Sequence, residues 1–218
     1  MVHSNKRKLR LSGWLMENGQ EEYSSALKFQ KFLFFYEAFT KIDGETPDWN
    51  SLKGYRNGPV FGTVLGDYTH ERSAFDAAAR KEYEASPEQI NETRAIKSKF
   101  ITEIMSEKEL SDLTHKLNIW MAKKNRITAG EQQVELCESD LNESDEAILR
   151  TLEQMYSLEF IENSHIIKMD NHYFLFSKDD IPKITGEHYD TLSVLANSGE
   201  LSNPIYVEID DEGRLLVD

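Results

Sequence analysis

The chain has little of what a disulfide-rich or membrane protein needs. Cys137 is the single cysteine among 218 residues, so no disulfide can form within the chain, and the sequence disfavours a metal site built from cysteines. No run of about 18 or more apolar residues is present, and Met1–Lys8 lacks the apolar stretch and small-residue cleavage site of a signal peptide. We therefore expect a cytoplasmic protein without a membrane segment.

Sequence motifs for catalysis are also lacking. The chain has no H-E-x-x-H, no phosphate-binding glycine-rich loop, no G-x-S-x-G and no pair of cysteines at metal-ligand spacing. The candidates for catalytic groups are carboxylates and four histidines, His115, His165, His172 and His188. The sequence thus predicts no catalytic residue, no metal site and no cofactor, and an enzyme of unknown type is the lesser alternative among the functions considered.

Acidic residues, in contrast, are abundant and unevenly placed. The chain has 39 acidic and 25 basic residues, a net charge of -14. Residues 1–130 hold 18 acidic and 20 basic residues, a charge of +2, whereas residues 131–218 hold 21 and 5, a charge of -16. A negative surface repels nucleic acid and membrane headgroups and attracts basic protein surfaces. The charge therefore predicts a protein partner with a basic surface.

The pattern along the chain predicts three regions, of which the first is a basic arm. Residues 1–23 contain Lys6, Arg7, Lys8 and Arg10 without apolar periodicity, which is typical of a frayed N-terminal arm. Such an arm can bind nucleic acid, but no helix-turn-helix is visible and the overall charge opposes promoter binding.

Residues 24–128 have the pattern of a helical bundle. After the candidate cap Ser25, apolar residues follow helical spacing from 26 to 39 and cover nearly all sides of the predicted helix, as expected at the centre of a bundle. Gly58 and Pro59 predict a turn that leads directly into a helix reaching residue 68. Further helix starts are predicted at Ser86 and, with a capping box, at 106–109.

The segment from 110 to 121 is predicted to form a helix with one apolar face. It presents Leu110, Leu113, Leu117 and Met121 at spacings of three and four, so this face is expected to pack inward with His115 on the opposite side.

Residues 129–218 predict a smaller region of mixed structure. A helix is expected at 144–155 and another at 188–197, with β-hairpins formed by 166–169 and 172–176 and by 205–209 and 214–217. The predicted fold class is α+β, with a mainly helical N-terminal bundle followed by a smaller C-terminal region that contains helices and two β-hairpins. The second region can pack on the first as one globule.

Three segments resemble a known family. They are Leu27–Phe35 with its lysines and aromatics, Arg56-Asn57-Gly58-Pro59-Val60, and Leu110-Ser111-x-Leu113-Thr114-His115 followed by Trp120. In order and spacing, over about residues 24–124, the chain is similar to the Panacea domain of the SocA-like and GepA-like antitoxins of bacteria and prophages. It departs from the family at Ile119, where proline is frequent, and at Tyr55, where tryptophan or alanine is usual.

The resemblance implies an antitoxin that neutralises a cognate protein toxin by direct binding. One branch of the family also delivers its toxin to a protease, which makes a protease a further candidate partner. The signature residues are expected to be structural or toxin-binding; they are Lys31, Gly58, Pro59, Val60, Leu110, Thr114, His115 and Trp120.

Most of these residues are expected to have a structural role. Lys31 is expected to reach the surface or to cap a carbonyl, Gly58 and Pro59 to shape a turn, and Trp120 to lie in the core. Partner specificity is expected in the acidic region after Gly130. An alternative that uses the same charge is a phage or prophage inhibitor that imitates nucleic acid to block a host defence protein.

Overall fold

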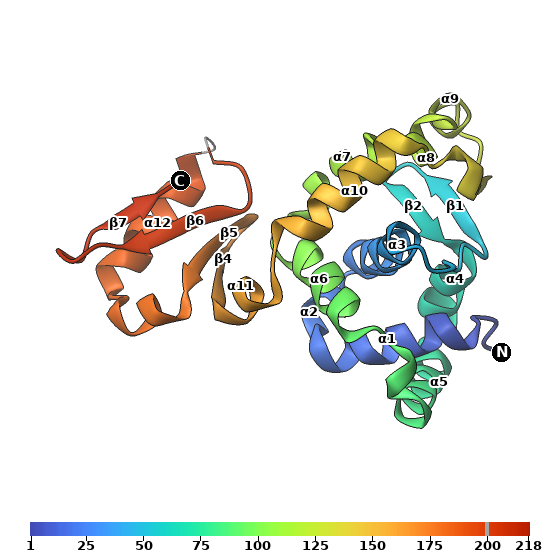
Figure 1. Cartoon of the computed structure of the whole chain (residues 1–218), viewed down its shortest axis with the longest axis horizontal. Coiled ribbons are helices and arrows are strands. Elements are labelled where there is room, and N and C mark those ends of the chain that lie inside the picture. Colours follow the sequence, from blue (N-terminus) through green and yellow to red (C-terminus); the bar gives the residue numbers. More distant parts are fainter. Residues whose placement is uncertain (199–200) are drawn as a thin grey trace.

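Helices predominate in the computed structural model, which describes residues 1–198 and 201–218, and two small sheets accompany them (Figure 1). The predicted α+β class is confirmed. Figure 1 shows two lobes side by side, joined where α10 leads into α11. None of the helices in these two ranges is both long and apolar enough to cross a membrane.

The first lobe contains ten α-helices, two 3-10 helices and three strands among the described residues. They are α1 (Lys6–Asn18), α2 (Gln20–Ser24), α3 (Ala26–Ile42), β1 (Leu52–Tyr55), β2 (Gly58–Phe61), α4 (Gly62–His70), α5 (Arg72–Ala85), η1 (Pro87–Gln89), α6 (Glu92–Glu103), α7 (Glu107–His115), α8 (Asn118–Met121), α9 (Lys124–Thr128), β3 (Val134–Glu135), η2 (Glu138–Asp140) and α10 (Glu143–Met155).

The second lobe is built around a four-stranded sheet. Its elements are α11 (Leu158–Asn163), β4 (Ser164–Met169), β5 (His172–Ser177), η3 (Lys178–Lys183), α12 (Gly186–Ser198), β6 (Ile205–Ile209) and β7 (Leu215–Val217). Both predicted hairpins form, β4 with β5 and β6 with β7, and β5 and β6 pair in parallel to give the order β4-β5-β6-β7. The helices predicted at 144–155 and 188–197 are confirmed as α10 and α12.

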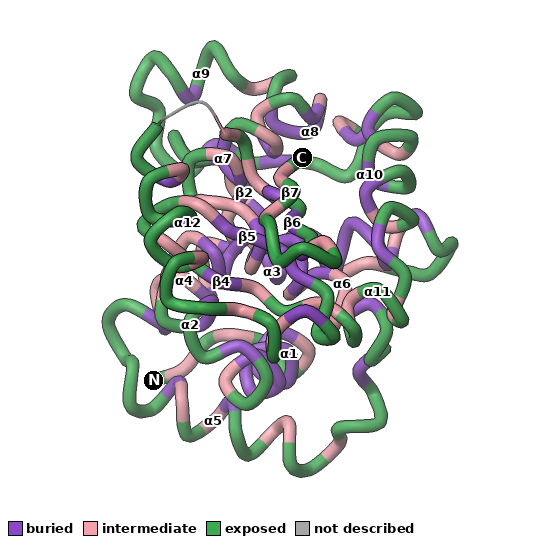
Figure 2. Tube along the Cα trace, turned by 90° about the vertical axis from the view of Figure 1, so that its left-hand side faces the viewer, coloured by how far each residue is buried: buried purple, intermediate pink, exposed green. Residues whose placement is uncertain are grey.

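Helix α3 lies at the centre of the first lobe. Its N-cap Ser25 accepts a hydrogen bond from the backbone N–H of Lys28, and the apolar side chains that follow are buried on every side of the helix. Figure 2 shows the buried residues concentrated in the interior, with exposed residues along the outer turns. The prediction of a central, fully covered helix is confirmed.

The predicted basic arm is wrong, because residues 6–18 form α1 and pack against α5. Gly13 marks the contact, since a Cβ there would lie 2.4 Å from the carbonyl oxygen of Ala79. Lys8 and Arg10 are buried, so they are unavailable to nucleic acid.

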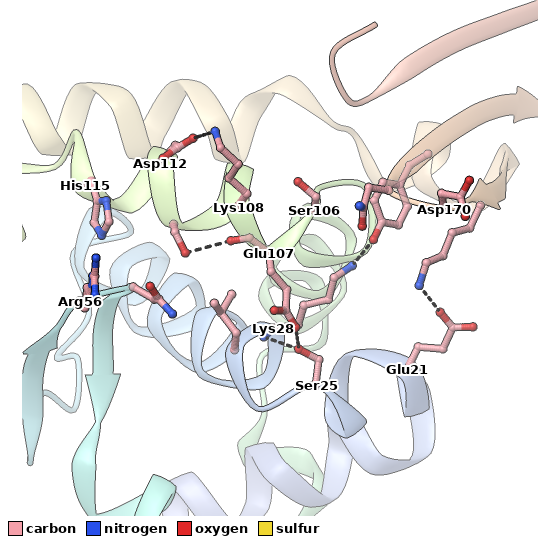
Figure 3. A pocket seen from close by; sticks show the side chains of 16 residues that line it. Glu21, Ser25, Lys28, Arg56, Ser106, Glu107, Lys108, Asp112, His115 and Asp170 are labelled. Atoms are coloured by element: carbon pink, nitrogen blue, oxygen red, sulfur yellow. Dashed lines mark hydrogen bonds and ion pairs between the residues drawn. The ribbon is translucent and has the colours of Figure 1, made fainter. Parts of the chain in front are cut away.

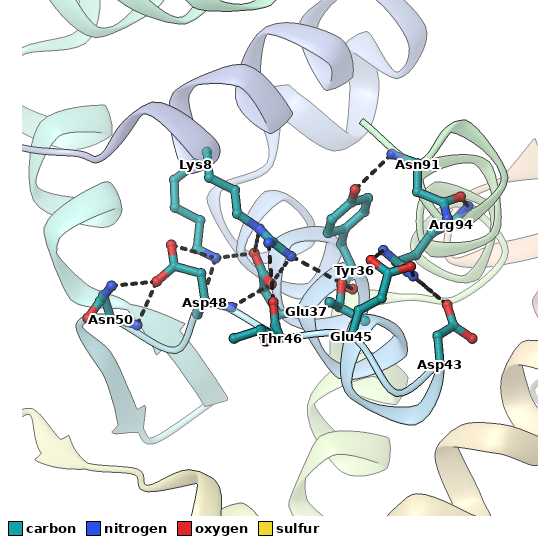
Figure 4. A network of polar contacts seen from close by, with 12 residues as sticks. Lys8, Tyr36, Glu37, Asp43, Glu45, Thr46, Asp48, Asn50, Asn91 and Arg94 are labelled. Carbon is teal, nitrogen blue, oxygen red and sulfur yellow. Dashed lines mark hydrogen bonds and ion pairs between the residues drawn. The ribbon is translucent and has the colours of Figure 1, made fainter. Parts of the chain in front are cut away.

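Internal ion pairs account for two of the basic residues at this place in the sequence, Arg7 and Lys8. The buried Glu37 carboxylate of α3 contacts Lys8 Nζ at 2.5 Å and Arg7 Nη2 at 2.6 Å, and it accepts the N–H of Asp48 at 2.8 Å (Figure 4). Burial lowers the pKa of Lys8, while the charge of Glu37 opposes that change. A buried carboxylate needs such partners, which fixes α1 against α3.

A hairpin replaces the helix predicted to begin at Pro59. β2 pairs antiparallel with β1, from Tyr55 opposite Gly58 to Leu52 opposite Phe61, and α4 begins only at Gly62. β3 completes the three-stranded sheet through Val134, which pairs with Gly54. The expectation of a purely helical bundle over residues 24–128 is therefore wrong, because β1 pairs locally with β2 and, on its other edge, with β3, which lies 80 residues further along the chain.

Two further helix boundaries differ from the prediction. The start predicted at Ser86 is a 3-10 turn, and α6 begins at Glu92 with Asn91 as its cap. The capping box of Ser106 and Glu109 is confirmed, but α7 ends at His115.

The expected single apolar face from 110 to 121 is consequently wrong. Leu110 and Leu117 are buried, Leu113 is half-buried and Met121 is half exposed on the short α8. The chain breaks between the two helices because Asp145, buried on α10, accepts the N–H groups of Asn118 and Ile119 at 2.6 and 2.9 Å.

The boundary predicted between residues 128 and 129 does not separate the two lobes. The first hydrophobic core includes Val134, Leu136, Leu149 and Leu152, so the first lobe extends through α10. A small cluster then joins the lobes, in which Leu175 packs with Phe100, Ile104 and Tyr156.

The boundary between the lobes, after Met155 at the end of α10, also divides the acidic region. Residues 131–155 have a net charge of -7, with 8 acidic residues and 1 basic residue, and residues 156–218 a charge of -9, with 13 and 4. The second lobe is therefore the more uniformly acidic part of the molecule.

Candidate functional site

Residues 27–35, 56–60 and 110–120, the three segments with signature residues, meet at one place in the first lobe. Lys31 on α3 is fully buried, and its Nζ donates to the carbonyl of Asn57 at 2.7 Å and approaches that of Pro59 at 3.4 Å. Lys31 thus caps carbonyl groups of the β1–β2 turn, which is one of the two roles expected for it; it does not reach the surface. Burial lowers the pKa of Lys31 to about 7.

Gly58 leaves room for Lys31 and for α7. Its φ of +106° lies in the region that favours glycine, and a Cβ would lie 2.2 Å from Lys31 Nζ and 2.5 Å from Thr114 Oγ1. Thr114 is buried, and its hydroxyl donates to the carbonyl of Leu110 at 2.9 Å. Lys31, Gly58 and Thr114 therefore interlock without space for another heavy atom.

The outer edge of β2 is completed by side chains of α3. Gln30 Oε1 accepts the N–H of Phe61 at 2.8 Å, and Lys31 approaches the Pro59 carbonyl from the same helix. Pro59 itself has no N–H to offer. Two neighbouring polar residues of a buried helix thus take the place of an adjacent strand and protect this edge.

His115 and Trp120 form a second pair beside this interlock. Their rings stack with centroids 3.9 Å apart, and Trp120 Nε1 donates to the carbonyl of Tyr55 at 2.9 Å. Trp120 is buried, as expected, and His115 is half-buried with an Nε2 atom that has no hydrogen-bond partner. Burial and the nearby charge of Lys31 lower the pKa of His115.

A groove of about 840 Å³ begins at His115 and continues to the second lobe. In Figure 3, Arg56 and His115 lie side by side at one end, and Asp170 lies at the other. Lys28 crosses between the lobes, with Nζ donating to the hydroxyl of Tyr173 at 3.1 Å. A second contact joins Lys168 to Glu21 at 3.6 Å.

Some of the ionisable groups along the groove pair with one another or with a neighbouring hydroxyl. Lys108 pairs with Asp112 at 2.7 Å, and Glu107 accepts the hydroxyl of Ser25 at 2.6 Å. Across residues 1–198 and 201–218, no group of three or more His, Cys, Asp or Glu side chains is arranged to hold a metal ion. The groove therefore has a polar lining that combines ion-paired side chains with Arg56, whose side chain has no hydrogen-bond or ion-pair partner among the described residues, and with His115, whose Nε2 atom has no hydrogen-bond partner there.

The remaining signature residues have simpler positions. Leu110 and Pro59 are buried, and Val60 is half-buried at the edge of a small cavity next to the groove. Sequence reasoning missed Gln30, Arg56 and Asn57 as parts of this site. The signal that was available is the adjacent polar pair Gln30 and Lys31, which lies between Phe29 and Phe32 in the aromatic part of the helix.

Comparison of the chain with protein-family models, with curated proteins and with solved structures gives no match.

Proposed function

We propose that the chain is an antitoxin that neutralises a protein toxin by direct binding. The observation that carries the proposal is the interlock of Lys31, Gly58 and Thr114 beside the groove of about 840 Å³. These residues come from three segments that resemble the Panacea domain, and the first and the last of them, Lys31 and Thr114, are 83 positions apart in the sequence. Their meeting at one surface groove supports a shared recognition scaffold.

The charges support a partner that has a basic surface. In residues 131–155, Glu138 pairs with Lys41, Asp140 with Lys123, and Glu153 with Lys97. Those acidic residues serve the first lobe itself. On the second lobe, with its charge of -9, exposed carboxylates such as those of Glu159 and Glu208 make no ion pair within the described residues. We place the charge-guided contact with the toxin on this lobe.

The test is co-expression with the reading frame that neighbours the gene. We expect that reading frame to arrest growth when it is expressed alone, to be tolerated together with this chain, and to co-purify with it. A harmless neighbour, or a toxic one that neither binds this chain nor is neutralised by it, would contradict the proposal.

Salt dependence tests the contribution of charge. Toxin affinity should fall as ionic strength rises, because exposed charges are screened over about 10 Å at 0.1 M salt. The double substitution Glu159→Gln and Glu208→Gln should weaken binding, whereas the exposed first-lobe substitution Glu143→Gln serves as a matched control. Affinity that is independent of salt and unchanged in the double variant would remove the second lobe from the interface.

An acidic inhibitor that imitates nucleic acid is the second candidate function, since the charge of the second lobe serves it equally. This function predicts binding to a nuclease or another nucleic-acid-binding defence protein, and competition by DNA. A toxin whose binding DNA does not displace would separate the two functions.

A further inference from the structure

A small cavity next to the groove has walls from three elements of the first lobe. Its apolar lining includes Leu27 of α3, Val60 of β2 and Leu65 of α4, each half-buried. Its volume is about 280 Å³, below the range of about 300–1,000 Å³ that is usual for pockets holding a small-molecule ligand. The cavity suits a single large side chain.

A buried hydrogen-bond donor lines the same cavity. Gln30 is 2% exposed, and its Oε1 is held by the N–H of Phe61, which fixes the orientation of the amide. Gln30 Nε2 is buried and has no partner among the described residues. A buried donor without an acceptor is costly, so an occupant that brings a carbonyl oxygen gains more here than at an ordinary surface.

An unpaired positive charge, that of Arg56, lies at the opening of this cavity. Arg56 is exposed on the β1–β2 turn, and within residues 1–198 and 201–218 its side chain makes no hydrogen bond or ion pair. The residue borders both this cavity and the groove, where Figure 3 shows it beside His115. An exposed guanidinium in this position favours an occupant with a carboxylate.

We propose that this cavity binds one aliphatic side chain of the partner protein, adjacent in the partner's sequence to an acidic residue. The aliphatic group packs against Leu27, Val60 and Leu65, a backbone carbonyl of the partner accepts from Gln30, and the carboxylate pairs with Arg56. The proposal rests on the proposed function for the existence of a protein partner and adds the chemistry that this site recognises. It places an anchor on the first lobe, apart from the acidic second lobe.

Two short peptides test the cavity without any toxin. Titration of the full chain with acetyl-Leu-Asp-amide should shift the side-chain NH₂ resonances of Gln30 and the backbone resonances of residues 55–60 in ¹H–¹⁵N NMR spectra. Acetyl-Leu-Lys-amide should bind about two- to fivefold more weakly, as the loss of one exposed ion pair allows. Unshifted Gln30 resonances, or equal binding of the two peptides, would overturn the inference.

The complex provides the second test. Arg56→Glu should weaken toxin binding roughly tenfold, because it places like charges together at the contact. Arg80→Glu on α5 makes the same charge change at another exposed site and should leave affinity within about twofold.

The two tests separate the two proposals. Equal affinity of the wild type and Arg56→Glu would overturn the anchor while the antitoxin function stands. If no toxin binds the wild type, the proposed function fails. The peptide titration alone then decides whether the cavity binds an aliphatic side chain next to an acidic residue.

Discussion

Among the buried polar side chains of α3, those of Gln30, Lys31 and Glu37 each hold a different part of the first lobe. Lys31 caps the carbonyls of the β1–β2 turn, Gln30 accepts from Phe61 at the strand edge, and Glu37 pairs with Lys8 and Arg7 of α1. A helix with apolar side chains on every side would bind its neighbours with little directional preference. The polar side chains specify which element lies where.

Gly58→Ala should be strongly destabilising. The new Cβ would meet Lys31 Nζ and Thr114 Oγ1, and alanine at a φ of +106° is strained, so we expect a loss of about 2–4 kcal/mol. Urea unfolding followed by circular dichroism measures it. Gly66→Ala is the control, since a Cβ at this helical position meets nothing within 4 Å and should stabilise by about 0.5–1 kcal/mol. Equal stability of the two variants would contradict the interlock.

Lys31→Met should change how stability depends on pH. The unfolded lysine binds its proton below about pH 10.5 and the folded one only below about pH 7, so between these values the unfolded chain holds more protons and stability rises with pH. Between these two pKa values, Lys31 raises the free energy of unfolding by about 1.4 kcal/mol for each pH unit. Urea unfolding at pH 7.5, 8.5 and 9.5 should show a smaller rise in the variant.

The comparison needs a lysine control because burial also lowers the pKa values of Lys8 and Lys28. Both lysines are present in the wild type and in the variant, so only the difference in slope reports Lys31. Lys108→Met removes an exposed lysine whose pKa Asp112 raises, and its profile in this pH range should parallel the wild type. Parallel profiles for Lys31→Met would mean that Lys31 is charged in the folded protein throughout this range.

At the scale of elements, short segments depend on partners that are distant in sequence. α8 is a single turn, and its N-terminal N–H groups bind Asp145 of α10. β3 contributes two residues, which pair with β1. Neither segment has enough residues to form alone, because helix nucleation and strand pairing both cost conformational entropy.

Asp145→Ala should loosen α8 and the stacking of its Trp120 on His115. The substitution removes a buried carboxylate that accepts two backbone N–H groups, and we expect a loss of about 2–3 kcal/mol. Hydrogen exchange should accelerate at Asn118 and Ile119. Ser144→Ala, exposed in the same turn of α10, is the control and should leave both exchange rates unchanged. Unchanged exchange in Asp145→Ala would remove the cap from the account of α8.

At the scale of the whole molecule, the two lobes have separate cores and a modest contact. The first core extends from Leu9 to Leu152, and the second gathers around Phe174, Leu192 and Val207. Besides the small joining cluster, Asn203 Nδ2 donates to Glu109 of α7 at 2.8 Å, and Lys28 donates to Tyr173. The groove lies between bodies that are joined by one small apolar cluster and by several polar contacts.

A fragment of residues 1–155 should therefore fold without the second lobe. It keeps the complete first core, and it loses the cover of Phe100 and Ile104 by Leu175, so we expect cooperative unfolding at reduced stability. A fragment of residues 1–128 lacks Val134, Leu149 and Leu152 and should not unfold cooperatively. Circular dichroism melting distinguishes the two. Cooperative unfolding of the shorter fragment would restore the boundary that the sequence predicted.

The sequence by itself determined the elements whose signals are local. Ser25 and the aromatic residues that follow it specify α3, and Ser106 and Glu109 specify the start of α7. Strand-like segments on either side of short turns specify both hairpins of the second lobe. These signals need only neighbouring residues, because caps, periodicity and turns act within a few positions. The acidity of the last third and the lack of a catalytic motif were equally readable.

Only the tertiary structure decided what depends on contacts between distant segments. It turned the basic start into a buried helix through Glu37, made Gly58 and Pro59 part of a strand, and ended α7 at His115 through Asp145. It also brought Gln30, Lys31 and Arg56 to one cavity edge. The reason is that buried charges and strand edges take the partners that folding brings near them, and separation along the chain does not identify those partners.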